Sequence, residues 1–310
     1  MTRFNSLATT TQHSLVGILH LTRWKEQLPL VSLTLLGSLV AYSVHNVTLD
    51  WRLVAVALAN FLTVSFAFMI NDMEDAEDDA KNPHSARRNP ITNGSLDMRT
   101  AWAACVLFVS AALVLYAISG PLVVLVGTVN LTLSYLYSWK PVRLKSSNIG
   151  LDVVSHTLML GGLLPLAGYF AFSNNMHIAI VAMTLAATLG STYGQLYNQI
   201  RDYETDASAG IVNLTSYLGK RLTWTLAYTA VGVTIVSGVI AFSHMNFPGW
   251  LPYLIGVTTV IGFSGSYLLS HVDASGKPAL DWTGRLQLGF WFALTVTILV
   301  WGAWAMTGGF

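Results

Sequence analysis

Acidic residues gather in two short segments of this sequence that are suited to binding divalent cations. Six of the fifteen Asp and Glu residues lie within residues 72–79, and three more lie within residues 202–206. In each segment an Asn and two Asp residues follow one another at intervals of four, and the second set lies 127 positions after the first. This matched spacing predicts an internal repeat. The residues are Asn71, Asp75 and Asp79, followed by Asn198, Asp202 and Asp206.

The spacing also suggests what these acids do. Side chains three or four residues apart lie on one helical face, so Asp72, Asp75 and Asp79 are expected to project together if their helix continues past the membrane. Asp202 and Asp206 are expected to do the same. Like charges at this spacing repel, and Mg²⁺ binds one or two carboxylates while keeping other positions for water and substrate phosphates. Two such faces across a cleft predict two or more Mg²⁺ ions around a diphosphate; the alternative is a solvated acidic helix end.

The elements that position these acids are apolar. Charged residues make up 10% of the chain and the mean hydropathy is +0.55, whereas soluble domains are about 25% charged. This composition predicts an all-α polytopic membrane protein, and a net charge of +1 argues against a nucleic-acid partner. Breaks at 120–121, 173–175 and 244–249 divide the longest stretches, giving nine transmembrane helices. The charge-free stretches are 28–44, 53–70, 100–139, 153–200, 222–272 and 286–306.

The basic residues predict the orientation. Fifteen of the sixteen Lys and Arg residues precede the first helix or lie in every second loop, so the N-terminus and both acidic segments are expected in the cytoplasm and the C-terminus outside. We expect one domain, 1–310, with two four-helix pseudo-repeats and a ninth helix around a central cavity. Residues 1–27 form a cytoplasmic or interfacial N-terminal segment, and residues 71–100 and 198–221 form cap loops with the Asp-rich motifs.

The two acidic motifs resemble those of the UbiA superfamily of intramembrane prenyltransferases. The family's Asn-Asp-x-x-Asp-x-x-x-Asp motif matches residues 71–79, and its Asp-x-x-x-Asp motif matches residues 202–206. Residues 87–94 resemble the family's Asn-Arg-Pro-Ile-x-x-Gly stretch with the order of Arg and Asn altered, and residues 137–145 resemble its loop between helices 4 and 5. The family's usual Arg-Pro before the first helix is replaced here by Arg23-Trp24-Lys25. The resemblance extends over nearly the whole chain.

The resemblance implies a Mg²⁺-dependent enzyme that transfers an isoprenyl chain from an allylic prenyl diphosphate to a lipophilic, often aromatic, acceptor. It implies that Asp72, Asp75, Asp79, Asp202 and Asp206 bind the metal. Asn71 and Asn198 then help to bind the diphosphate, and cap-loop cations contact its phosphates. The candidate cations are Lys81, Arg88, Arg143 and Lys145; each is also explained as a topology charge.

A mechanism follows from these residue types. Metal and cations would stabilise the leaving diphosphate while apolar helices keep water from an allylic cation. Asp75 or Asp202 would deprotonate the acceptor as the catalytic carboxylate, although metal binding competes with that role. Asp152 and His156 are four residues apart and are expected to pair, either structurally or beside the acceptor. Weaker candidates for the acceptor or prenyl pocket are Tyr135, His156, Tyr193 and Tyr197, for which core packing is the alternative.

Other functions share parts of this pattern. A UbiA-like terpene cyclase would ionise the same diphosphate without an acceptor. A CDP-alcohol phosphotransferase also places Asp at helix ends, but its Asp-Gly-x-x-Ala-Arg element is absent. A cation transporter with an acidic vestibule would place its site near the membrane midplane, where this sequence has no carboxylate. No obligate protein partner is evident, and chain length, acceptor and oligomeric state stay open.

Overall fold

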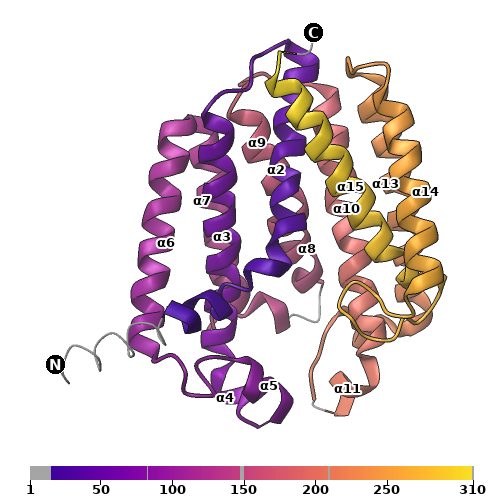
Figure 1. The fold of residues 1–310 in the computed structure, drawn as a ribbon. Helices are drawn as coiled ribbons and strands as arrows, with labels where there is room; N and C mark the ends of the chain where they lie inside the picture. Colours follow the sequence, from indigo (N-terminus) through magenta and orange to yellow (C-terminus); the bar gives the residue numbers. More distant parts are fainter. Residues whose placement is uncertain (1–14, 82, 147–149, 209, 309–310) are drawn as a thin grey trace, which may run out of the picture.

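The computed structural model describes residues 15–81, 83–146, 150–208 and 210–308, and this part of the chain is helical throughout. Extended structure in the described ranges is limited to an isolated bridge between Val272 and Pro278. Long helices stand side by side in one bundle, with short helices at one of its ends (Figure 1). The long helices are α2 (Trp24–His45), α3 (Arg52–Glu74), α6 (Met98–Ser119), α7 (Pro121–Ser138), α8–α9 (Leu151–Phe170), α10 (Ile178–Arg201), α13 (Lys220–Ser243), α14 (Leu251–Leu269) and α15 (Trp282–Met306).

Eight helices in the described residues are long and apolar enough to cross a membrane. The remaining long helix, α10, has 24 residues but carries more polar side chains, among them Thr188, Gln195 and Asn198. The predicted breaks occur where expected. Gly120 ends α6 with φ 141°, a conformation that favours glycine, and Pro121 begins α7 at a position where its missing N–H costs nothing.

One membrane segment is less regular than the sequence predicts. Residues 151–170 consist of α8 (Leu151–Thr157), a π-helical turn (Leu158–Gly162) and α9 (Leu163–Phe170). Such turns hold one extra residue and often occur near functional sites. The π-turn packs against α10, where a Cβ atom on Gly161 would lie 2.7 Å from the carbonyl oxygen of Ala187.

Small residues bring the central helices α2 and α9 close together. A Cβ atom on Gly37 would lie 1.8 Å from the Pro165 carbonyl oxygen, and one on Gly168 would lie 2.0 Å from that of Thr34. Ser38 donates a hydrogen bond to the Gly168 carbonyl oxygen at 3.0 Å. Close backbone approach through small residues is typical of membrane helix pairs, which lack a hydrophobic driving force between them.

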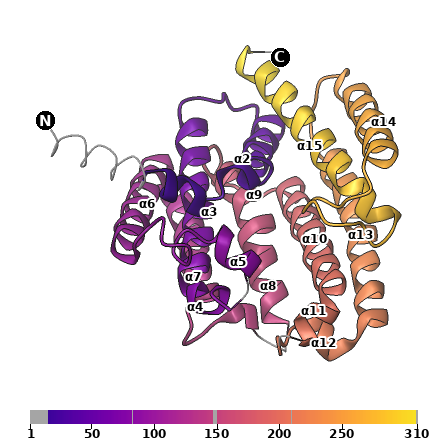
Figure 2. The same ribbon diagram turned by 60° about the horizontal axis from the view of Figure 1, so that its bottom comes forward.

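Both acidic segments lie at the same end of the bundle. The first lies in and around α4 (Ala76–Asp79) and α5 (Pro83–Arg88), and the second in α11 (Tyr203–Ser208), followed by α12 (Leu214–Leu218). Figure 2 brings this end forward, while the C-terminal end of α15 lies at the opposite end in Figure 1. Of the expected N-terminal segment, residues 1–14 lie outside the described part, and residues 15–21 are helical.

Candidate functional site

Each acidic segment starts where a long helix ends, and the two ends have the same geometry. Asp75 follows the last residue of α3 with φ −88° and ψ −3°, and Asp202 follows the last residue of α10 with φ −89° and ψ 6°. Their backbone N–H groups donate to the carbonyl oxygens of Asn71 and Asn198. The long helix is interrupted at the middle Asp in both segments, but the backbone N–H groups of Asp79 and Asp206 still donate to the carbonyl oxygens of Asp75 and Asp202 at 2.8 Å, so helical spacing continues into the short helices that follow.

Asp72 is held by an arginine from the N-terminal segment. Arg23 binds its carboxylate through two nitrogens, with Nη2 against Oδ1 and Nε 3.3 Å from Oδ2. The Asp72 side chain is 3% exposed and that of Arg23 is 14% exposed. The guanidinium also lies over the Phe68 ring at 5.2 Å. Arg23 thus neutralises a carboxylate that would otherwise be buried without a cation.

Asp75 binds two of the four candidate phosphate-binding cations, Arg143 and Lys145. Arg143 Nη2 lies 2.9 Å from Oδ1, and Lys145 Nζ lies 2.5 Å from Oδ2. Lys145 also donates to Asn71 Oδ1 at 2.9 Å. Burial lowers the pKa of Lys145 despite the opposing charge of Asp75. The structure therefore brings Asn71, Asp75, Arg143 and Lys145 together.

The remaining predicted residues of the first half, Asp79, Lys81 and Arg88, form no ion pair or side-chain hydrogen bond with the Asp75 carboxylate among the described residues. Asp79 accepts a hydrogen bond from Asn89 Nδ2 at 2.8 Å, and Asn89 also donates to the Asp72 carbonyl oxygen at 2.7 Å. Lys81 pairs with Asp78 at 3.0 Å on the surface. Arg88 is exposed and forms no ion pair within the described ranges. The structure thus connects Asp79 to Asp72 through Asn89 but brings neither Lys81 nor Arg88 to the first-motif carboxylates.

The second segment is held by a hairpin from much later in the chain. Asp202 binds Arg201 at 2.9 Å and Lys277 at 2.8 Å. Arg201 reaches on to Asp273, which is fully buried and also accepts hydrogen bonds from Ser275. Burial alone would raise the pKa of Asp202, but its bonds to Arg201 and Lys277 lower it below the usual range.

Asp206 lies in a different environment from Asp202. Its carboxylate accepts a hydrogen bond from Asn213 Nδ2 at 2.9 Å. Burial, followed by the negative charge of Asp202, raises the pKa of Asp206 above its usual range. The two carboxylates of this motif therefore differ in their affinity for a proton.

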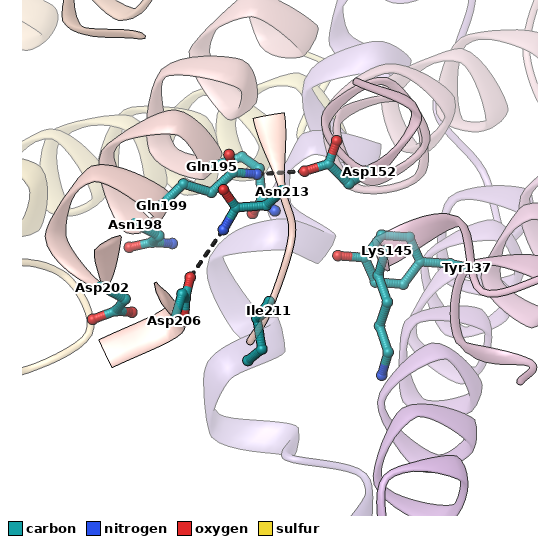
Figure 3. Close-up of a pocket in the computed structure, with 10 residues that line it drawn as sticks. All are labelled: Tyr137, Lys145, Asp152, Gln195, Asn198, Gln199, Asp202, Asp206, Ile211 and Asn213. Carbon is teal, nitrogen blue, oxygen red and sulfur yellow. Dashed lines mark hydrogen bonds between the residues drawn. The ribbon is translucent and has the colours of Figure 1, made fainter. Parts of the chain in front are cut away.

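A cavity of about 230 Å³ lies against the second motif. The second motif forms one wall, and Tyr137 and Lys145 approach from the other side (Figure 3). Lys145 links the cavity to the first motif, because it pairs with Asp75. The lining residues are Tyr137, Lys145, Asp152, Gln195, Asn198, Gln199, Asp202, Asp206, Ile211 and Asn213.

The donor set of this cavity fits Mg²⁺ in its chemistry. Asn198, Asp202 and Asp206 offer amide and carboxylate oxygens, which hard cations prefer. In the first motif, Asp72 is already bound at both oxygens by Arg23. Among the described side chains, no three of His, Cys, Asp and Glu are arranged to hold a metal. Asp202 is likewise engaged at both oxygens, by Arg201 and Lys277, so Asn198 and Asp206 offer the oxygen atoms of the second motif that no described Lys or Arg engages.

The four weaker candidates for an acceptor or prenyl pocket lie outside this cavity. Tyr135 stacks on Trp139 with ring centroids 5.2 Å apart. Tyr193 donates to Thr283 Oγ1 at 2.7 Å, and the Tyr197 hydroxyl accepts the Leu280 N–H at 2.7 Å. His156 lies against the Tyr137 ring at 5.8 Å. Tyr137 and Gln195 occupy cavity positions instead, and no periodicity in the sequence distinguishes them from their neighbours.

Sequence reasoning missed two cations that contact the motifs, Arg23 and Lys277. Both were counted only as charges that set the topology. Each lies far from its partner in sequence, 49 residues for Arg23 and Asp72 and 75 residues for Lys277 and Asp202. The replacement of the family's Arg-Pro by Arg23-Trp24-Lys25 is a sequence signal that could have found Arg23. No sequence signal points to Lys277.

Comparison with known proteins agrees with this architecture. A UbiA homolog from Archaeoglobus fulgidus bound to GPP and Mg²⁺ is 21% identical, with a TM-score of 0.71 over 94% of this chain and 99% of that one. A digeranylgeranylglyceryl phosphate synthase has 19% identity and a TM-score of 0.68, over 95% and 99% of the two chains. The apo UbiA homolog from Aeropyrum pernix K1 has 17% identity and a TM-score of 0.66, over 90% and 97%.

These identities establish a shared fold. Comparison with curated proteins finds no match. The family model of the UbiA prenyltransferases matches residues 30–294, a range that contains both acidic motifs and all but the ends of the membrane bundle. Together with its apolar helices, this makes the protein an integral, multi-pass membrane protein. The chain belongs to the UbiA prenyltransferase family.

Proposed function

We propose that the protein transfers an isoprenyl group from an allylic prenyl diphosphate to a lipophilic acceptor in the presence of Mg²⁺. The cavity that joins the second motif to Lys145 carries this proposal, because it places oxygen ligands for a cation opposite a cation for phosphate. Related folds bound to GPP or DMAPP together with Mg²⁺ support the choice of diphosphate and metal.

Asn198, Asp202 and Asp206 would hold the metal in this cavity, with Asp75, Asp79 and Asn71 completing the site from the first motif. Bound Mg²⁺ would neutralise charge on the leaving diphosphate. Arg143 and Lys145, which pair with Asp75, would contact the phosphates. Their charges favour departure of the diphosphate with the bonding electron pair, and the surrounding apolar helices keep water from the allylic cation.

The membrane arrangement extends this proposal. We place the cap helices α4, α5, α11 and α12 in the cytoplasm and the C-terminal end of α15 outside, following the distribution of Lys and Arg. Counting α10 as a span gives nine crossings. The matched helix ends at Asp75 and Asp202 support two four-helix repeats with α15 added.

The test measures diphosphate released by purified protein from geranyl, farnesyl and geranylgeranyl diphosphates. Release is expected to need Mg²⁺, to stop in EDTA, and to be lost in Asp75→Asn and Asp202→Asn. Glu204→Gln is the matched control, since Glu204 belongs to the same segment but pairs with Lys220 on the surface. Full activity in both Asp variants, or in EDTA, refutes the proposal.

A cyclase of the same family remains the second candidate because it would use the same cavity without an acceptor. Mass spectrometry separates the two functions. A cyclic product from a prenyl diphosphate alone identifies a cyclase, and a product whose mass equals acceptor plus prenyl group identifies a transferase. Comparing geranyl, farnesyl and geranylgeranyl diphosphates in the same assay would define the preferred chain length.

A further inference from the structure

A third carboxylate lines the cavity and belongs to neither acidic motif. Asp152 lies in the first turn of α8 and is 1% exposed. In Figure 3 it lies across the cavity from Asp202 and Asp206, on the side from which Tyr137 and Lys145 approach. No Lys or Arg of the described chain forms an ion pair with it.

The orientation of this carboxylate is fixed from one side. Gln199 Nε2 donates to Asp152 Oδ2 at 2.5 Å. Gln199 Oε1 in turn accepts the Thr215 N–H at 3.1 Å and the Thr215 hydroxyl at 3.0 Å. Since the amide oxygen is occupied by two donors, the amide nitrogen must be the atom that faces Asp152. The pairing of Asp152 with His156 expected from their spacing is not formed.

The other oxygen is left without a partner. Asp152 Oδ1 is buried and accepts no hydrogen bond from the described residues. Burying a carboxylate without a cation is costly, and the cost is relieved when the group takes up a proton. An oxygen with no donor or cation against it is therefore available to take up a proton.

Three of the motif carboxylates have no such oxygen. Asp75 and Asp202 each bind two cations, and Asp72 is bound by Arg23. The oxygens of these three carboxylates are therefore already engaged by Lys and Arg side chains. Metal binding would occupy the same oxygens. Asp152 is the lining carboxylate that neither cations nor the proposed metal engage.

We propose that Asp152 is the catalytic proton acceptor of this transfer, an inference that rests on the proposed function. The bond between prenyl C1 and the diphosphate oxygen breaks, and the electron pair leaves with the diphosphate. A π bond of the acceptor forms the new bond to C1, which leaves a cation on the acceptor. A neighbouring C–H bond then breaks; its electrons restore the double bond, and its proton goes to Asp152 Oδ1. Water that enters when the diphosphate leaves removes this proton.

Two variants separate this role from a structural one. Asp152→Asn keeps the size of the side chain and an oxygen for Gln199, but removes the proton acceptor. Gln199→Met removes the hydrogen bond between Gln199 and Asp152 but leaves the carboxylate intact. Purified proteins are given Mg²⁺, labelled geranylgeranyl diphosphate and a panel of phenolic and polyene acceptors. Released diphosphate and the carbon products are measured separately, together with the thermal unfolding midpoint.

Asp152→Asn is expected to release diphosphate within about threefold of the wild-type rate. The amount of coupled or alkene product formed per diphosphate is expected to fall at least about tenfold, and prenyl alcohol is expected to form instead. Gln199→Met, which loses the orienting hydrogen bond but keeps the proton acceptor, is expected to lower this product ratio less than Asp152→Asn does. If Asp152→Asn does not fold, Asp152→Glu is expected to give more coupled product per diphosphate than Asp152→Gln.

An unchanged product ratio in Asp152→Asn overturns the inference, and so do equal losses in Asp152→Asn and Gln199→Met. In the fallback pair, equal ratios in Asp152→Glu and Asp152→Gln overturn it as well. A wild-type protein that releases no diphosphate from any prenyl diphosphate instead overturns the proposed function, and this inference with it. The two failures are therefore told apart by the wild-type reaction alone.

Discussion

Removing Arg23 should destabilise the protein through the carboxylate that it leaves behind. Arg23→Met keeps most of the aliphatic stem but leaves Asp72, whose side chain is 3% exposed, without its cation. Breaking a buried ion pair from one side typically costs about 3–5 kcal/mol. The lost contact with the Phe68 ring adds about 0.5–1 kcal/mol. Because Arg23 itself is partly exposed, we expect a total near the lower end, about 3 kcal/mol.

The converse substitution should cost less. Asp72→Asn keeps a hydrogen-bond acceptor, and the Arg23 it leaves unpaired is 14% exposed and can reach water. We expect a loss of about 1–2 kcal/mol. In the double variant no buried charge is left, so it should be more stable than the sum of the single changes predicts, by about 1–2 kcal/mol.

Equilibrium unfolding in mixed detergent micelles, followed by tryptophan fluorescence, measures these free energies. Arg52→Met is the matched control, because Arg52 also lies over an aromatic ring, that of Phe172, but pairs with the more exposed Asp50. We expect the control to cost less than about 1 kcal/mol. The reasoning is refuted if Arg23→Met stays within 0.5 kcal/mol of the wild type, or if the double variant loses the full sum.

Three further results are expected. Lys277→Met should raise KM for the prenyl diphosphate several-fold because Asp202 loses one of its cations. Lys220→Met, which breaks a surface ion pair with Glu204, should leave KM unchanged. Equal KM values for the two variants in initial-rate assays would contradict this prediction. Gly37→Ala should destabilise the α2–α9 contact by about 1–3 kcal/mol in the same unfolding assay, while Gly238→Ala, with open space around it, should be neutral or stabilising; a tolerated Gly37→Ala would show that the helices can separate freely. His177 Nδ1 accepts the Ala179 N–H at the start of α10, and burial, then His45 and His244, lower the pKa of His177. Because the unfolded chain takes up this proton first, unfolding free energy should fall as pH drops below about 6.5, and His177→Asn, which keeps the cap, should flatten that fall in unfolding measured from pH 7.5 to 5.

The sequence predicts the helices better than it predicts the contacts between them. Long charge-free stretches and breaks such as Gly120-Pro121 depend on local chemistry, so the observed helix ends lie within a few residues of expectation. The sequence does not predict the interruption of the long helices at Asp75 and Asp202, because spacing by four is the same on either side of such an interruption.

The site residues show the same difference between what local sequence predicts and what depends on packing. Asn71, Asp75 and Lys145 meet because the first motif and the loop after α7 lie at one end of the bundle. Arg23 and Lys277 could not be assigned, since their partners depend on how distant segments pack. Asp152 and His156 show the limit of spacing arguments, because a neighbouring helix supplies Gln199 as the better partner.

The hairpin after α14 also sets an order on how the site is completed during synthesis. Asp202 and Arg201 leave the ribosome long before their partners, since Lys277 follows Asp202 by 75 residues. At translation rates of about 5–20 residues per second, this separation corresponds to roughly 4–15 s. During that interval Arg201 lacks Asp273 and Asp202 lacks Lys277. A nascent chain must therefore insert α13 and α14 beside a half-paired second motif, and only the last stages of synthesis give this motif its final charge balance.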